Sequence, residues 1–340
     1  MAPTRSRTAR RLAVVAAAAA LTLTACSDGG DAGGGGASGG EGGGDLDASF
    51  LTIATGGTSG VYYQVGATFG EILKDELESD TTVQSTGASA ENINLLTDGN
   101  AEIAFTMGDA NAQAIEGTGP FEGEPRGGLM AMAALYPNTA QIVATKASGI
   151  ESVEDLKGKR VSVGDVGSGV ELNAQLILDA HDMSYEDMQV DYLPYGEAAE
   201  QMANGLTDAA FVTSGVPNPS LTELETNTEF IILPITGDAK ERLLTEHDFF
   251  VEDEIPGGTY LQDDAVETVG VTNHVMLSSQ LSDDAAYDIT KAFFENLEQI
   301  HSAHAAAKAI SLEKATTGLT APLHPGAQRY FEENGVELPE

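Results

Sequence analysis

Short strand-like runs alternate with longer helical runs from Phe50 to the C-terminus of this 340-residue chain. The first run, Leu51–Ala54, is strand-like, and apolar side chains then recur at helical spacing over Tyr62–Leu77. Strands that are separated by helices favour an α/β architecture with mostly parallel sheets. This alternation restricts the possible folds more than any other feature of the chain.

The same patterns mark the remaining elements. We predict strands at Leu51–Ala54, Thr82–Ser85, Ile103–Thr106, Leu129–Leu135, Gln141–Ala144, Arg160–Val163, Val190–Tyr192, Ala209–Val212, Phe230–Pro234 and Val269–Val271. We predict helices near Tyr62–Leu77, Ala90–Asp98, Val170–His181, Glu197–Asn204 and Leu221–Thr226, and through Asp283–Ala309. One apolar stripe along the last of these predicts that it packs on one side.

Two long extended stretches flank the second α/β block, one at residues 129–146 and one at about 260–278. Such crossings suggest two lobes joined by a hinge, because the chain would leave the first lobe, build the second and then return. We therefore expect lobe 1 to contain residues 49–138 and 268–340, and lobe 2 to contain residues 139–267.

The N-terminus has the pattern of an export signal. Four arginines within residues 5–11 precede a short apolar run at residues 12–21, which is too short to span a bilayer. Leu23-Thr24-Ala25-Cys26 then resembles the lipobox of bacterial lipoproteins, which implies a signal peptide at residues 1–25 and lipidation of Cys26. An ordinary signal peptide with an incidental cysteine is the alternative. Cys26 is the only cysteine of the chain, so we expect no disulfide.

Residues 26–48 are rich in glycine and almost free of apolar side chains. Such a segment cannot bury enough surface to order itself, and a flexible coil of this length reaches about 25 Å on average. We expect it to be a tether that holds an extracytoplasmic domain, lipid-anchored to the cell membrane.

The formal net charge of −37 argues against two classes of partner. A surface this acidic repels phosphate backbones and anionic headgroups, so we expect no nucleic acid binding and no membrane contact except through the anchor. A solvated acidic surface, as in a salt-adapted organism, explains the charge without any acid-dependent function.

Three turns of one kind follow predicted strands and precede predicted helices. They lie at residues 55–60, 85–90 and 164–169, and each is rich in Gly, Ser or Thr. Glycine lets a ligand approach the backbone, helix N-termini supply N–H donors and partial positive charge, and hydroxyls rotate to fit. Each turn alone could merely cap its helix. Together, at the carboxyl ends of strands, they predict a cleft for a small anion such as a carboxylate.

Other residues near these turns are candidates for the same cleft. Adjacent Tyr62 and Tyr63 cannot share a helix face, and Tyr63 is the one expected in the cleft. Asn92 would donate to the ligand or simply cap its helix. If the ligand is an amino acid, Glu171 and Asp109 are candidates for its ammonium, although acid placement at a helix start also explains Glu171.

Several stretches resemble the TAXI family, the TRAP-associated extracytoplasmic solute-binding proteins. They are Thr55–Tyr63, Ser85–Asn92, Asp155–Gly164 with Gly167-Ser168-Gly169, and Pro322–Ala327. The resemblance covers the chain from about Phe50 onward. It implies a two-lobe, type II periplasmic-binding-protein-like (Venus flytrap) fold with a ligand cleft between the lobes. Ala88 departs from the pattern, because Gly or Ser is common at its position.

The resemblance also implies a function. It implies delivery of a carboxylate such as glutamate, glutamine or 2-oxoglutarate to the membrane permease subunits of a TRAP-type secondary transporter. Presentation of the ligand to a sensor kinase, or an enzyme on the same scaffold, are the alternatives. We expect a monomer and not an enzyme, because no Ser–His or Cys–His arrangement is suggested.

The expected ligand-binding residues come from these turns and their neighbours. They are Thr55, Gly57, Thr58, Gly60, Tyr63, Thr86, Ala88, Ser89, Asn92, Asp109, Tyr136, Gly167, Ser168, Gly169, Glu171, Thr213 and Ser214. His301 and His304 have a spacing that can bind metal, but no third ligand is apparent. We therefore expect no metal and no cofactor.

Overall fold

The computed structural model describes residues 46–339. The predicted signal peptide, Cys26 and most of the predicted tether lie outside these residues. The described residues belong to one compact unit, so the lobe boundaries near residues 138 and 268 stay predictions.

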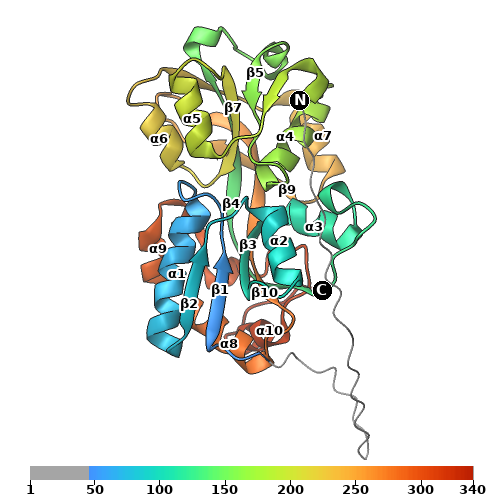
Figure 1. The fold of residues 1–340 in the computed structure, drawn as a ribbon, viewed down its shortest axis with the longest axis vertical. Coiled ribbons are helices and arrows are strands. Elements are labelled where there is room, and N and C mark those ends of the chain that lie inside the picture. The colour runs from blue at the N-terminus through green and yellow to red at the C-terminus, as the bar shows by residue number, and fades with distance from the viewer. Residues whose placement is uncertain (1–45, 340) are drawn as a thin grey trace, which may run out of the picture. The chain divides into compact units, whose positions relative to one another are not determined.

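Strands and helices alternate through the first part of the chain (Figure 1). The elements are β1 (Phe50–Ala54), α1 (Val61–Leu77), β2 (Asp80–Gln84), α2 (Ser89–Thr97), β3 (Ile103–Met107) and α3 (Gly108–Glu116). β1 pairs in parallel with both β2 and β3. We call these elements, together with the C-terminal helices α8 (Asp283–Glu295), α9 (Leu297–Ala303) and α10 (Pro325–Glu333), the first block.

The second block repeats this alternation. Its elements are β5 (Arg160–Ser162), α4 (Gly169–Ala180), β6 (Gln189–Asp191), α5 (Tyr195–Ala203), β7 (Ala209–Ser214), α6 (Pro219–Leu224), β8 (Phe230–Leu233), α7 (Gly237–Glu246) and β9 (Phe250–Ile255). β5 pairs in parallel with β6 and β7. The predicted α/β class with mostly parallel strands is therefore present in both blocks.

Two long strands connect the blocks (Figure 1). They are β4 (Leu129–Thr145) and β10 (Val266–Ser278), which pair with each other in antiparallel register. β10 also pairs with β3 of the first block, and β4 also pairs with β7 and β8 of the second. The two strands that we predicted at Leu129–Leu135 and Gln141–Ala144 are thus one strand.

Each block has its own apolar core. In the first block α1 packs against α8, where the rings of Phe69 and Phe293 meet edge to face with centroids 4.9 Å apart. In the second block the buried side chains of α4 and β7, such as Ile177 and Phe211, share one cluster. These separate cores fix the strand ends that carry the Gly- and Ser-rich turns.

Four elements were not predicted from the sequence: α3, α7, β9 and α10. The single late helix that we expected is also interrupted, because the backbone of Asn296 leaves the helical conformation between α8 and α9. No helix among residues 46–339 is both long enough and apolar enough to cross a bilayer.

Candidate functional site

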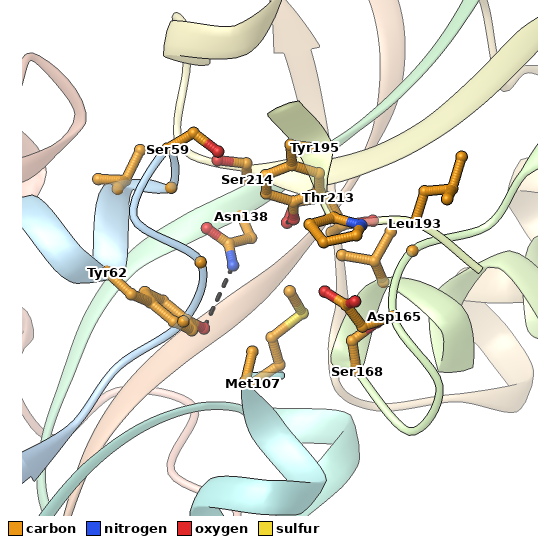
Figure 2. A pocket seen from close by; sticks show the side chains of 18 residues that line it. Ser59, Tyr62, Met107, Asn138, Asp165, Ser168, Leu193, Tyr195, Thr213 and Ser214 are labelled. Atoms are coloured by element: carbon orange, nitrogen blue, oxygen red, sulfur yellow. Dashed lines mark hydrogen bonds between the residues drawn. The ribbon is translucent and has the colours of Figure 1, made fainter. Parts of the chain in front are cut away.

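A cavity lies where the first and second blocks face each other (Figure 2). It encloses about 550 Å³ of empty volume, part of which is open to solvent. Its lining consists of Gly56, Gly57, Ser59, Gly60, Val61, Tyr62, Ala88, Met107, Asn138, Gly164, Asp165, Ser168, Val170, Leu193, Pro194, Tyr195, Thr213 and Ser214.

The N-cap residues of five helices line this one cavity. They are Gly60 of α1, Ala88 of α2, Met107 of α3, Ser168 of α4 and Pro194 of α5. Only the Ser168 side chain accepts a hydrogen bond from its own helix, at 3.1 Å from the backbone N–H of Glu171. Each N-terminus carries a partial positive charge, so the five together favour a bound anion.

Ala88 has an unusual backbone conformation at this site. Its φ of 69° and ψ of −141° lie in a region that residues with a Cβ rarely adopt. The Thr86 hydroxyl accepts a 3.0 Å hydrogen bond from the Ala88 N–H and so helps to hold the turn. Strain of this kind tends to occur where a chain must present backbone groups to a ligand.

A polar network ties α1 to both connecting strands at the cavity. The Tyr62 hydroxyl donates to the side-chain oxygen of Asn273 on β10 and accepts a 3.2 Å hydrogen bond from Asn138 Nδ2 on β4 (Figure 2). Asn273 Nδ2 in turn donates to Asn138 Oδ1 at 2.8 Å and to the Tyr136 carbonyl at 2.9 Å. All four residues are buried, so the network fixes this wall of the cavity.

The charge of the lining is one-sided. No Lys, Arg or His is among the lining residues, whereas Asp165 is. Burial raises the pKa of Asp165, and the nearby carboxylates of Glu197 and Glu91 raise it further. Any positive potential in the cavity therefore comes from backbone N–H groups rather than from basic side chains.

The structure brings together residues from all three predicted turns and from the end of β7. Six of the expected ligand-binding residues line the cavity: Gly57, Gly60, Ala88, Ser168, Thr213 and Ser214. The three small-residue turns and the carboxyl end of β7, which carries Thr213 and Ser214, thus meet at one place. Ligand binding by these six residues stays a prediction.

Other expected residues support the turns without lining the cavity. Asn92 Nδ2 donates to the carbonyls of Thr55 and Phe105, at 2.5 and 2.7 Å, and so joins the ends of β1 and β3. The Thr86 hydroxyl donates to Asn92 Oδ1, and the Thr55 hydroxyl donates to the Gln84 carbonyl. The Ser89 hydroxyl accepts from the Met107 N–H. Their hydrogen bonds are therefore internal, which corrects the expectation of donors directed at a ligand.

The two tyrosines are placed the other way round from our expectation. Tyr62 lines the cavity and packs against Phe105, while Tyr63 is only half-buried and lies away from the lining. One residue along a helix turns the side chain by about 100°, so only one of the pair can face the cavity. Thr58 is exposed, and buried Tyr136 lies behind the lining.

The two acids that we considered for an ammonium group are engaged elsewhere. Asp109 is fully buried and accepts a 2.7 Å hydrogen bond from Asn173 Nδ2. The Glu171 carboxylate accepts from the N–H of Gly167, the Gln175 amide and the Tyr185 hydroxyl. Neither acid lines the cavity. Glu171 therefore stabilises the start of α4, as its alternative interpretation proposed.

Gly167 and Gly169 lie at the contact between the blocks rather than in the lining. A Cβ on Gly169 would lie 2.6 Å from the Met107 sulfur and 3.0 Å from the Ser89 hydroxyl. A Cβ on Gly167 would lie 3.5 Å from that of Ala90, whose N–H also donates to the Gly167 carbonyl. These glycines allow the third turn to approach the first block closely.

Several lining residues were missed by the sequence analysis. Asp165 lies inside a predicted turn, so its position alone could have identified it as a lining residue. Asn138 and Met107 lie on strands in apolar or extended runs, where nothing in the local pattern distinguishes them from core residues. Leu193 and Pro194 precede α5 and Tyr195 begins it, but this segment has no glycine or hydroxyl cluster of the kind that marked the other turns.

The described residues give no sign of a metal site. No cluster of three or more His, Cys, Asp and Glu side chains occurs among them. His301 is hydrogen-bonded to the Ile310 carbonyl, and His304 Nδ1 accepts from the Ala306 N–H. The His-x-x-His spacing is therefore used for backbone hydrogen bonds.

Comparisons with known proteins bear on both fold and family. The model of the NMT1-like family matches residues 53–335 of this chain. PhnD1 from Prochlorococcus marinus, solved with methylphosphonate, is 13% identical with a TM-score of 0.51, and the match covers 77% of this chain and 92% of that one. A protein of Bordetella bronchiseptica RB50 is 17% identical with a TM-score of 0.50, covering 84% and 82%.

The alkanesulfonate-binding protein SsuA from Xanthomonas axonopodis pv. citri, bound to MOPS, is a further similar structure. It is 14% identical with a TM-score of 0.45, and the match covers 76% of this chain and 74% of SsuA. The predicted periplasmic-binding-protein-like α/β fold is confirmed. The more specific TAXI assignment stays a prediction, because the matching model is described only as NMT1-like.

Proposed function

The chain belongs to the NMT1-like family, and on that premise we propose that it is an extracytoplasmic binding protein that captures a small carboxylate. One observation carries the proposal: the N-cap residues of five helices line a single small cavity. Helix N-termini supply directed N–H donors and partial positive charge, which together suit a compact anion.

Backbone and hydroxyl donors are sufficient for useful affinity. A hydrogen bond to a charged group contributes roughly 1.5–3 kcal/mol, and micromolar binding corresponds to about −8 kcal/mol. Four or five such bonds, reduced by the cost of ordering the ligand, reach this range without a basic side chain. The hydroxyls of Ser59, Ser168, Thr213 and Ser214 in the lining add donors.

Capture would proceed by closure of the two blocks. The anion docks on the turns of the first block, and the Gly164–Ser168 turn of the second block then covers it, with β4 and β10 as the hinge. The cross-block contact of Gly169 with Met107 supports this interpretation. The ligand stabilises the closed state only by binding it more tightly than the open one.

We further propose that the closed protein delivers its ligand to a TRAP-type permease. The support is the resemblance of its turn and C-terminal motifs to the TAXI family, together with the export-signal pattern that precedes the tether. Methylphosphonate, the ligand of PhnD1, is also a small anion and belongs in any ligand screen.

The test is a thermal-shift screen followed by calorimetry, with glutamate, glutamine, 2-oxoglutarate and methylphosphonate. Ser168→Asp keeps a good N-cap for α4 but adds a negative charge to the lining, and Ser168→Asn keeps the cap and stays neutral. We expect the Asp variant to lose binding and the Asn variant to keep most of it. The absence of binding by every compound, or equal binding by both variants, would refute the proposal.

A further inference from the structure

Asp165 is the single acidic side chain among the residues that line the cavity. Within residues 46–339 its carboxylate has no ion pair and no hydrogen bond. Its backbone carbonyl accepts from the Ser168 N–H at 2.9 Å. In Figure 2, Asp165 and Ser168 face Tyr62 and Met107 across the cavity. The site that suits an anion thus also presents an unpaired negative charge.

The surroundings of Asp165 make this charge unfavourable in the absence of a ligand. Its side chain is half-buried, and the first turns of α2 and α5 bring Glu91 and Glu197 close enough to raise its pKa. A Cβ on Gly87 would lie 4.0 Å from the Asp165 Cβ, so the second turn also confines it. A ligand ammonium beside Asp165 would offset the cost of burying its carboxylate and the repulsion from Glu91 and Glu197.

A ligand that carries only negative charge would place like charges together in a small cavity. A ligand with one carboxylate and one cationic group avoids this repulsion, because its carboxylate can lie at the helix N-termini while its cation lies at Asp165. Asp109 and Glu171, the acids first expected to bind an ammonium, cannot take this role, since both lie outside the lining and already accept hydrogen bonds.

We propose that the ligand is a small zwitterion of the α-amino acid class, and that Asp165 is the residue that pairs with its ammonium group. This inference rests on the proposed function and narrows its substrate class. It makes Asp165 the specificity determinant that separates amino acids from the corresponding simple acids.

The experiment compares ligand pairs that differ only in the ammonium. L-glutamate with glutarate, and L-alanine with propionate, are titrated by calorimetry into the wild-type protein and into Asp165→Asn. We expect at least one amino acid to bind the wild type at least 10-fold more tightly than its partner acid. In Asp165→Asn that preference should shrink by 10-fold or more, mainly through weaker binding of the amino acid.

Asp238→Asn provides the matched control. Asp238 is exposed in the first turn of α7 and does not line the cavity, so its neutralisation should leave the preference unchanged. The thermal unfolding midpoint of Asp165→Asn should be at or above that of the wild type, which shows that any loss of binding is not a loss of folding.

The experiment distinguishes failure of the zwitterion inference from failure of the proposed function. If glutarate, propionate or another simple acid binds the wild type as tightly as every amino acid tested, the zwitterion inference is wrong while the proposed carboxylate site stands. The same holds if Asp165→Asn keeps the full preference. If no compound of either kind binds, and none in the earlier screen does, the proposed function itself fails.

Discussion

Asn173 Nδ2 donates a 2.7 Å hydrogen bond to Asp109 Oδ2, and this bond joins α4 of the second block to α3 of the first. Both side chains are fully buried, and the Oδ1 atom of each has no hydrogen-bond partner among residues 46–339. Burial raises the pKa of Asp109 to about 7. A carboxyl group that stays protonated up to about pH 7 therefore lies at the contact between the blocks.

This carboxyl group should make stability depend on pH. The pKa is about 7 in the folded protein and about 3.9 in an unfolded chain, so the folded state binds more protons between these values. The contribution of Asp109 is then fully present below pH ~4 and is lost as the pH rises to about 7. We expect Asp109→Asn to raise the free energy of unfolding at pH 8 by up to ~4 kcal/mol, with little gain at pH 4.

Denaturant unfolding of wild type and Asp109→Asn between pH 4 and 8 measures this difference. Asp238→Asn, which changes an exposed carboxylate, controls for the general effect of removing one negative charge. If the unfolding free energies of the wild type and Asp109→Asn change with pH in the same way, the pKa of Asp109 is not raised in the folded protein.

Removal of one hydroxyl should reveal the role of the network behind the cavity. Tyr62→Phe leaves the buried side-chain oxygen of Asn273 without the hydroxyl donor and removes the acceptor of Asn138 Nδ2. We expect a loss of roughly 1–3 kcal/mol in unfolding free energy, since buried polar groups then lack partners. Tyr63→Phe should change stability by less than about 0.5 kcal/mol. Equal changes in unfolding free energy for the two variants would show that the network contributes nothing to stability.

Relief of the strained turn should stabilise the protein. Glycine adopts the positive φ of Ala88 without a Cβ penalty, so Ala88→Gly should raise the free energy of unfolding by about 1 kcal/mol. Ala90→Gly, inside the first turn of α2 where the backbone is helical, should instead lower it by a similar amount. Thermal or denaturant unfolding distinguishes them, and destabilisation by both substitutions would mean that Ala88 is not strained.

Much of the fold was predictable because local patterns and packing agree. Leu51–Ala54 and Tyr62–Leu77 were placed within one residue of β1 and α1, since a buried strand and a one-sided apolar helix leave clear periodicity. The missed elements lack that signal. β9 carries Glu252, Asp253 and Glu254 in a strand whose position depends on pairing with β10, which no local pattern encodes.

Lining residues in turns before helices were predictable, because local sequence determines such turns. Lining residues brought to the cavity by contacts between segments far apart in the sequence were not. Small-residue turns before helices identified Gly57, Gly60 and Ser168, because glycine and hydroxyl residues have few other reasons to cluster there. Asn138 joins the cavity only because β4 crosses between the blocks beside Tyr62. The prediction placed Tyr63 in the cavity instead of Tyr62. The orientation of α1 about its own axis is set by its contact with α8, not by its first residues.

The anchor predicted at the N-terminus can be tested independently of the cavity. If Cys26 carries the lipid, Cys26→Ser should release the protein from the membrane fraction into the soluble fraction. Ser27→Ala, which changes the neighbouring residue and leaves the cysteine, should leave the protein in the membrane fraction. Retention of the Cys26→Ser variant in washed membranes would refute the lipoprotein prediction.

A single methyl group at the contact between the blocks should separate closure from folding. Gly169 begins α4 with an ordinary backbone conformation, so Ala at this position is not strained by its own φ. Its Cβ would nevertheless lie 2.6 Å from the sulfur of Met107, which is itself buried, and 3.0 Å from the Ser89 hydroxyl. These atoms belong to the opposite block, so the methyl group can be accommodated most easily if the blocks move apart.

We therefore expect Gly169→Ala to weaken ligand binding by 10-fold or more while the far-ultraviolet circular dichroism stays unchanged. Small-angle X-ray scattering with saturating ligand should show a larger radius of gyration than for the wild type. Gly127→Ala is the matched control, because a Cβ there would meet no atom within 4 Å. Wild-type affinity and an unchanged radius for Gly169→Ala would show that the contact between Met107 and Gly169 does not limit closure.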